Sequence, residues 1–278
     1  MGALSMTPTL VRRHRPSSSS PESRARDWAE IQERMLVPLY EAVYERLEVG
    51  SGTRLLSLGC GSGLALLMAA SRGAAVSGVD PDGRRLALAR ERLLPEGAGA
   101  ARLGHGAPES VMDAGSPPFN LVTAFDPLYC AGGSAQGMAT ALARAASCAE
   151  RGAPVVLAGW GPQERCAASG ALRVAARLAD PMCAPARWRP CGRDDLENLA
   201  QQAGLQPDGS GRVACPYGYA DMGSAVRGML STGAFDAAVR ATDEEQVVKE
   251  LSEALHPYLR RDGTVWMPNV FRYLIARA

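Results

Sequence analysis

A glycine-rich stretch between two apolar runs constrains the fold of this chain more than any other feature. It reads RLLSLGCGSGLALLMAASRGAAVSGVD, from Arg54 to Asp80. An apolar run of strand length ends at glycines, a helical pattern follows, and a second apolar run ends on an acid. A strand, a helix and a second strand in this order form a right-handed crossover between parallel strands. The stretch therefore predicts an α/β fold.

The same alternation continues along the chain. Apolar runs predict strands at 53–58, 75–79, 100–103, 119–125 and 154–160, and helical spacing predicts helices at 63–72, 82–94, 134–151 and 193–203. A sixth strand is predicted near 209–215 and a terminal strand at 270–278. A final strand that follows a long segment of another character can enter the sheet antiparallel. We expect a doubly wound, mostly parallel sheet covered by helices on both faces.

The two ends and one long insertion define the expected domain organisation. Residues 1–26 are basic and rich in serine and proline, which is typical of a loose tail, although a transit peptide has a similar composition. The sequence of residues 27–278 predicts a single domain. Apolar spacing predicts a helix over 27–47, which Pro38 would kink or divide, and a helical cap over 216–260. We expect the helix and the cap to close over the site as a lid.

Composition narrows the classes of partner. The 278 residues carry 30 Lys and Arg against 29 Asp and Glu, a net charge of +1, so no basic field attracts nucleic acid. The seven cysteines have no paired metal-site spacing, and no apolar run approaches the roughly 18 residues of a membrane span. We therefore expect a cytoplasmic protein that acts on a small molecule, without a metal, a membrane or a nucleic acid, and as a possible homodimer.

The glycine cluster predicts a ligand that carries a ribose. Gly59, Gly61 and Gly63 lack a Cβ, so a ligand can lie against the backbone, where free N–H groups open the next helix. Asp80 follows Gly59 by 21 residues and ends the next strand, which places a carboxylate where it can accept from both ribose hydroxyls. A dinucleotide fingerprint requires glycine at position 64, which is leucine. The mismatch favours S-adenosylmethionine.

Three motifs extend this interpretation to a known family. The stretches LLSLGCGSG, GVDPD and FNLVTAFD, within about 31–165, resemble the motifs of class I S-adenosylmethionine-dependent methyltransferases, and FRYLIARA near the C-terminus is a weaker match. The chain is most similar to the small-molecule methyltransferases of actinobacterial secondary metabolism. The resemblance implies a seven-stranded sheet whose last strand is antiparallel. It also implies that the three glycines contact the methionine part of the cofactor and that Asp80 holds the ribose.

The chain departs from the family pattern at three positions. Ser57 stands where the family usually has an acid that helps to hold the cofactor's ammonium group, and His105 stands near an acid that faces the adenine amino group. Asn120 replaces the usual aspartate at the start of the fourth strand. Two alternatives follow: cofactor binding is weakened, or the fold is kept after methyl transfer was lost.

Candidate site residues follow from these motifs. The expected cofactor-binding residues are Ser57, Gly59, Cys60, Gly61, Gly63, Asp80, Pro81, His105, Gly106 and Phe125. Asp126 and Tyr129 follow the fourth strand, where ligands bind in open α/β sheets, and Asp126 is either a base or a helix cap. His256 is a second candidate base, with a helix-end histidine near the negative end of a dipole as the alternative. Methyl transfer needs alignment more than a fixed catalytic motif.

The sequence thus favours methyl transfer from S-adenosylmethionine to a small metabolite. An enzyme of the same fold that binds the cofactor without using its methyl group, for example in a cyclisation, is the first alternative. A non-catalytic binding module of the same fold is the second.

Overall fold

The computed structural model of the protein describes residues 20–93, 101–113, 115–125, 135–179, 192 and 194–278. Seven strands form one sheet in the order β3-β2-β1-β4-β5-β9-β6. Their bounds are β1 Arg54–Leu58, β2 Ala75–Asp80, β3 Arg102–His105, β4 Leu121–Ala124, β5 Pro154–Trp160, β6 Gln206–Ala214 and β9 Val270–Arg277. β9 runs antiparallel to both β5 and β6, while the pairs from β3 to β5 are parallel. The predicted doubly wound, mostly parallel sheet with an antiparallel last strand is therefore confirmed.

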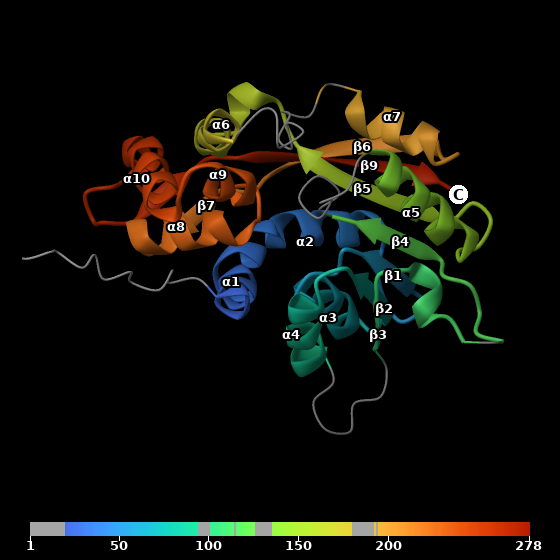
Figure 1. The fold of residues 1–278 in the computed structure, drawn as a ribbon. Coiled ribbons are helices and arrows are strands. Elements are labelled where there is room, and N and C mark those ends of the chain that lie inside the picture. Colours follow the sequence, from blue (N-terminus) through green and yellow to red (C-terminus); the bar gives the residue numbers. More distant parts are fainter. Residues whose placement is uncertain (1–19, 94–100, 114, 126–134, 180–191, 193) are drawn as a thin grey trace, which may run out of the picture.

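Helices cover both faces of this sheet (Figure 1). The first face carries α2 Val37–Arg46, α3 Leu64–Ser71 and α4 Gly83–Leu93, and the second carries α5 Ala135–Ser147 and α7 Asp195–Gln202. Successive strand residues point to opposite faces, so Leu55 joins the core under the first group of helices and Leu56 joins the core under the second. Burial on both faces explains why the central strands β1, β4 and β5 are mostly apolar.

A second group of elements extends from the end of the sheet formed by β5, β9 and β6 (Figure 1). It comprises α6 Ala168–Leu178, α8 Met222–Ser231, α9 Asp236–Ala241 and α10 Glu244–Leu255, with a two-stranded sheet of β7 Tyr217–Tyr219 and β8 Val265–Met267. Helices α8, α9 and α10 lie within 216–260, the segment in which a helical cap is expected. The pairing of β7 with β8 was not anticipated, because each has only three residues and its partner is remote in sequence.

The N-terminal segment differs from the single helix expected over 27–47. It consists of α1 Pro21–Asp27, the π-helical turn η1 Trp28–Gln32, the 3₁₀ turn η2 Glu33–Leu36 and then α2. Pro38 lies in the first turn of α2, where its missing N–H removes no helical hydrogen bond. The expected loose tail over 1–26 also overlaps α1. Ser20 caps this helix by accepting the Ser23 N–H at 3.1 Å.

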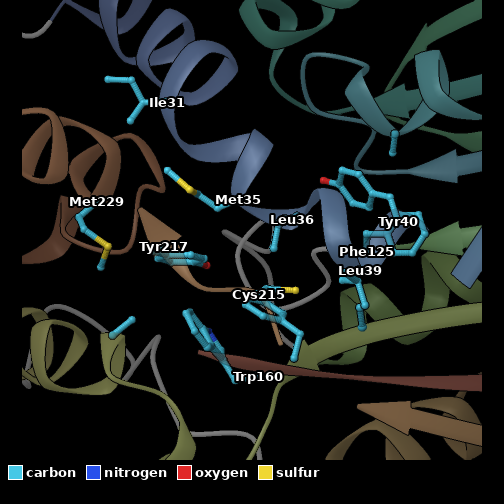
Figure 2. Close-up of a cluster of buried hydrophobic side chains, with 14 of the residues drawn as sticks. Ile31, Met35, Leu36, Leu39, Tyr40, Phe125, Trp160, Cys215, Tyr217 and Met229 are labelled. Carbon is cyan, nitrogen blue, oxygen red and sulfur yellow. The ribbon is translucent and has the colours of Figure 1, made fainter. Parts of the chain in front are cut away.

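An aromatic cluster joins the N-terminal segment to the sheet and to β7 (Figure 2). Tyr40 of α2 packs against Phe125 with ring centroids 4.8 Å apart, and Trp160 of β5 packs against Tyr217 at 5.9 Å. All four side chains are buried. The cluster fixes where the N-terminal segment crosses the ends of the strands.

Helices in the described ranges are all too short or too polar to cross a lipid bilayer.

Candidate cofactor site

The glycine turn after β1 has the backbone that the sequence predicts. Gly59, Gly61 and Gly63 have φ angles of 64°, 57° and 81°, a left-handed region in which a side chain is strained. The Cys60 N–H donates to the Val79 carbonyl at 3.1 Å, so the turn is tied to the neighbouring strand β2. Gly63 precedes α3 without a capping side chain, which leaves the first N–H groups of that helix near the turn.

Asp80 lies at the tip of β2 beside this turn. One carboxylate oxygen, Oδ2, accepts the Gly61 N–H at 2.8 Å, and Oδ1 accepts the Asp82 N–H at 2.8 Å. The residue is only 1% exposed. Burial raises the pKa of the Asp80 carboxyl, while the two backbone N–H groups act in the opposite direction. Each oxygen keeps capacity for a further donor, as ribose hydroxyls require.

The N-terminal residues 21–36, here called the strap, lie against the glycine turn. Glu33 is buried at 2% exposure. Its Oε1 accepts the Ser62 N–H at 3.1 Å, and its Oε2 accepts both the Ser62 hydroxyl and Arg92 Nη1, the latter at 2.9 Å. Burial raises the pKa of the Glu33 carboxyl, and the contacts with Ser62 and Arg92 lower it in part. A carboxylate from the strap thus binds Ser62 of the glycine turn, two residues before α3 begins.

Trp28 is the second strap residue at the turn. It is 3% exposed, and its indole Nε1 has no hydrogen-bond acceptor among the described residues. The Arg85 guanidinium of α4 lies over its ring, 4.1 Å from the ring centroid. A Cβ placed on Gly61 would lie 2.8 Å from Glu33 Oε1 and 3.1 Å from Trp28 Nε1. Both polar atoms therefore point at the bare backbone of Gly61.

The strap closes this part of the molecule to solvent. Cys60, Gly61, Ser62 and Asp80 are all buried. Three cavities along the described residues have linings that leave out the glycine turn and Asp80. One of them, of about 280 Å³, lies between α1, α8 and the start of α4, next to Asp82.

The residues present fit an adenosyl ligand. The backbone of Gly61 carries no side chain, a buried carboxylate stands beside it, and the Trp28 N–H, which has no acceptor in the described part of the chain, is directed at it. An orphaned buried donor is costly unless a partner arrives. In the described conformation Glu33 and Trp28 occupy the space over Gly61, so a ligand there must displace these strap atoms.

The remaining predicted cofactor residues lie around the turn and at the edge of the sheet. Ser57 is buried in β1, beside Gly78 of β2. His105 and Pro81 are exposed at the tips of β3 and β2, and His105 Nε2 donates to the Pro81 carbonyl at 3.0 Å. The Gly106 N–H donates to the Asp80 carbonyl at 3.3 Å. His105 and Gly106 are thus held next to Asp80.

Phe125 and the candidate base His256 do not lie at the glycine turn. Phe125 is buried between Tyr40 and Tyr44, with ring centroids 4.8 and 5.8 Å away, so it is part of the aromatic core. Asp126 and Tyr129 lie outside the described residues. His256 is exposed at the C-terminal end of α10, which packs on α6, α8 and α9 and lies apart from α3 and α4 (Figure 1).

Asn120 has a structural role that explains why it need not be an acid. Its Oδ1 accepts the Arg54 N–H at 2.7 Å, and its Nδ2 donates to the Gly52 carbonyl at 2.9 Å. This double hydrogen bond joins the start of β4 to the start of β1. An aspartate could not donate the second bond.

Sequence reasoning missed Trp28, Glu33 and Arg92. Trp28 fits the apolar spacing of the helix predicted over 27–47, so its spacing indicated packing and gave no sign of a role for its indole N–H. Glu33 lies between buried apolar positions, Ile31 and Met35, and an acid within an apolar stripe is the one signal that could have revealed it.

Comparisons with known proteins agree with this architecture. Residues 55–152 match the family model described as a methyltransferase domain. No match was found among curated protein sequences. A solved structure of a Bacillus halodurans protein superposes with a TM-score of 0.54 at 13% identity, covering 86% of this chain and 97% of the other. The structure of YjhP from E. coli superposes with a TM-score of 0.51 at 18% identity, and the match covers 91% of this chain and 98% of YjhP.

The [4+2]-cyclase SpnF is also similar, with a TM-score of 0.51 at 17% identity, covering 86% of this chain and 80% of SpnF. At these identities the likeness concerns the fold. By its strand order and these superpositions the chain has the fold of the class I S-adenosylmethionine-dependent methyltransferases, and its residues 55–152 match a methyltransferase domain.

Proposed function

We propose that this protein binds S-adenosylmethionine and transfers its methyl group to a small metabolite. The observation that carries the proposal is the contact between Asp80 and the glycine turn. A buried carboxylate at the tip of β2 accepts the Gly61 N–H at 2.8 Å, beside three glycines with positive φ. The match of residues 55–152 to a methyltransferase domain supports the same reaction.

In this proposal the chain binds the cofactor, aligns the methyl acceptor with it and excludes water. The bare backbone at Gly59 and Gly61 accommodates the methionine part, and Asp80 accepts hydrogen bonds from the ribose hydroxyls. S-adenosylmethionine supplies a methyl group on a sulfonium, and the group that leaves is a neutral thioether. The remaining contribution of the protein is to hold an acceptor at about 3–3.5 Å in line with that methyl and to exclude water.

An acceptor that loses a proton needs a base nearby. Asp126, with Tyr129 three residues further on, remains our first candidate because it follows β4 at the ligand-binding edge of the sheet. His256 remains the second candidate, and its exposed position at the end of α10 requires an acceptor that reaches the cap.

The expected acceptor is a small molecule, of the kind found in actinobacterial secondary metabolism. The balanced charge of the chain supports this class over nucleic acid. The helices α8, α9 and α10 form a group large enough to cover a metabolite. We also propose that the enzyme is cytoplasmic, because its seven cysteines have no paired spacing, and that it acts as a homodimer.

A cyclisation without methyl transfer is the second candidate. SpnF, a [4+2]-cyclase, shares the fold, and Ser57 lacks the charge that the family usually has at this position. Such an enzyme would bind the cofactor and leave its methyl group in place.

Calorimetry with S-adenosylmethionine and S-adenosylhomocysteine tests the proposal. We expect both to bind the wild-type protein. Asp80→Ala should weaken binding by about 2–3 kcal/mol, because two ribose hydroxyls lose their acceptor. Glu91→Ala, which removes an exposed acid on α4, is the control and should bind normally.

Methyl release on a panel of metabolites then separates the two enzymatic candidates. Release supports methyl transfer, and binding without release on any acceptor favours the cyclase alternative. A wild-type protein that gives no heat with either compound is a non-catalytic module, and the proposal is then wrong.

A further inference from the structure

A cavity that has no role in the proposed function lies beyond the carboxyl end of β5. It has a volume of about 780 Å³ and lies between the 3₁₀ turn η4 Gln163–Arg165, the start of α6, Tyr258 and the link from β8 to β9. Cavities of this size hold small ligands, and ligands of open α/β sheets bind outside the carboxyl ends of the strands. This cavity is here called the α6 cleft.

We propose that the α6 cleft binds the acidic group of a small organic molecule, with Arg165 and Arg173 as its cationic partners. The group recognised is a carboxylate or a phosphate. The inference goes beyond the proposed function, because an acid can bind here without a cofactor on the glycine turn.

The charge of the cleft favours an anion. Arg165 of η4 and Arg173 of α6 both line it and are exposed, and neither side chain has a hydrogen bond or an ion pair among the described residues. Of the described residues that line the cleft, Glu164 is the only acid. Two cations therefore face one anion. A guanidinium binds a carboxylate or a phosphate through paired hydrogen bonds.

One face of α6 presents polar groups to the cleft. Ser169, Arg173 and Arg177 follow one another at intervals of four residues, which places them on the same side of the helix. Arg177 forms an ion pair with Glu250 of α10, whereas Arg173 has none with Glu253, the other acid of the adjoining groove. The Ser169 hydroxyl adds a neutral donor, and the positive end of the α6 dipole lies beside it.

The walls of the cleft are fixed before a ligand arrives. The Ala167 N–H donates to the Pro268 carbonyl at 2.9 Å, and the Ala168 N–H donates to Oδ1 of the buried Asn269 at 3.0 Å. These bonds tie the start of α6 to the link between β8 and β9. Tyr258 and Pro268 add apolar surface for the organic part of a ligand. A preformed site loses less entropy when it binds.

A role for Arg173 in helix packing makes a different prediction. The helix α6 packs on α10 (Figure 1), and a pairing of Arg173 with Glu253 would stabilise that contact. Arg173→Gln would then lower the unfolding temperature and weaken all ligands alike. If Arg173 binds an acid, the variant should change the unfolding temperature by less than about 2 °C and weaken acids only.

Four probes test the cleft by ligand-observed nuclear magnetic resonance on the full chain. Phenylacetate and phenyl phosphate carry the acidic group, and phenylacetamide and phenol are their uncharged counterparts. The acids should bind the wild-type protein more tightly than the neutral probes. Arg165→Gln and Arg173→Gln should each weaken the acids about five- to twentyfold, as for a charge-assisted hydrogen bond in a partly exposed site, and the neutral probes by less than about twofold.

Two further variants serve as controls. Glu164→Gln removes the acid of the cleft, so both acidic probes should bind about two- to threefold more tightly, because a like charge no longer repels them. Arg151→Gln removes an exposed arginine that precedes β5, at the end of the strand opposite the cleft, and should leave all four probes unchanged.

Kinetics distinguish two sources of the acid. If the acid belongs to the methyl acceptor, Arg173→Gln should raise the KM of acidic acceptors and leave the KM of S-adenosylmethionine unchanged. If it belongs to a separate ligand, the variant should lose phenylacetate binding while methyl release is unaffected.

The outcomes also separate this inference from the proposed function. Equal binding of acidic and neutral probes to the wild-type protein, or undiminished binding of both acids in both arginine variants, overturns the cleft as an acid site. Failure of S-adenosylhomocysteine to bind the wild-type protein overturns the proposed function, and a selective loss of acid binding in the arginine variants would still support the cleft.

Discussion

At the scale of single residues, Gly61 combines two requirements that no other residue type meets. Its φ of 57° lies in the left-handed region, and the space where a side chain would begin is occupied by Glu33 Oε1 and Trp28 Nε1. The glycine pattern predicted the first requirement. The second depends on a segment almost thirty residues earlier in the chain, so it could not be predicted from local sequence.

Gly61→Ala should therefore destabilise the fold more than an ordinary glycine substitution. We expect a loss of about 2–4 kcal/mol in the free energy of unfolding, from left-handed strain and the displacement of Glu33. Gly152→Ala is the control, because Gly152 has a φ of 80° but no atom within 4 Å of its Cβ position. It should lose only about 1–2 kcal/mol. Equal losses in urea denaturation would show that the strap does not press on the turn.

The buried carboxyl of Glu33 should make stability depend on pH. Its pKa is raised in the folded protein, so the folded state binds a proton at a pH where the unfolded state does not. The resulting stabilisation is complete below the unfolded pKa of about 4.5 and is lost as the pH rises through the folded value.

Urea denaturation between about pH 4.5 and 7.5 should show this against Glu33→Gln, which cannot titrate. The wild-type protein should gain stability relative to the variant as the pH falls. A difference that shrinks on acidification would mean that the ion pair with Arg92 dominates over burial.

At the scale of elements, the sequence predicted those that depend on nearby residues and missed those that depend on remote contacts. Strands such as β1 and β5 are continuous apolar runs because both faces are buried, and this pattern is local. The turns η1 and η2 replace a predicted regular helix. They occur where the strap contacts the glycine turn, α4 and β7, and these contacts outweigh helical propensity.

The contact between the strap and β7 is a buried hydrogen bond. The Tyr219 hydroxyl donates to Gln32 Oε1 at 2.9 Å, and both side chains are buried. Tyr219→Phe leaves the Gln32 oxygen without this donor, so we expect a loss of about 1–3 kcal/mol in the free energy of unfolding. Tyr258→Phe, at a half-buried position, should lose much less. An unchanged free energy of unfolding in Tyr219→Phe would show that this hydrogen bond does not hold the strap.

At the scale of the whole molecule, β9 completes the sheet. It pairs with β5 on one side and with β6 on the other. The strand Val270–Arg277 therefore lies between two strands that precede it in the chain. The alternation of strands and helices predicted the mostly parallel sheet, and the resemblance implied the antiparallel last strand. The site was predicted where it depends on the glycines and Asp80. Its strap side was missed because those contacts link distant parts of the chain.

A chain that lacks residues 270–278 should fail to fold cooperatively. The truncation removes two ladders of backbone hydrogen bonds and exposes the edges of β5 and β6. We expect loss of near-ultraviolet circular dichroism and aggregation in size-exclusion chromatography. Arg277→Ala, which removes the side-chain contacts with Asp208 and the Gly152 carbonyl but keeps the strand, is the control and should remain folded. A monomeric truncated protein with native circular dichroism would contradict this role.

The place of β9 has a consequence for biosynthesis. Ribosomes deliver the chain from its N-terminus, so β5 leaves the exit tunnel well before its second neighbour, β9, is synthesised. During that interval β5 presents an open edge, to which another nascent chain can pair. We therefore expect the nascent chain to be most prone to aggregation between translation of β5 and of β9.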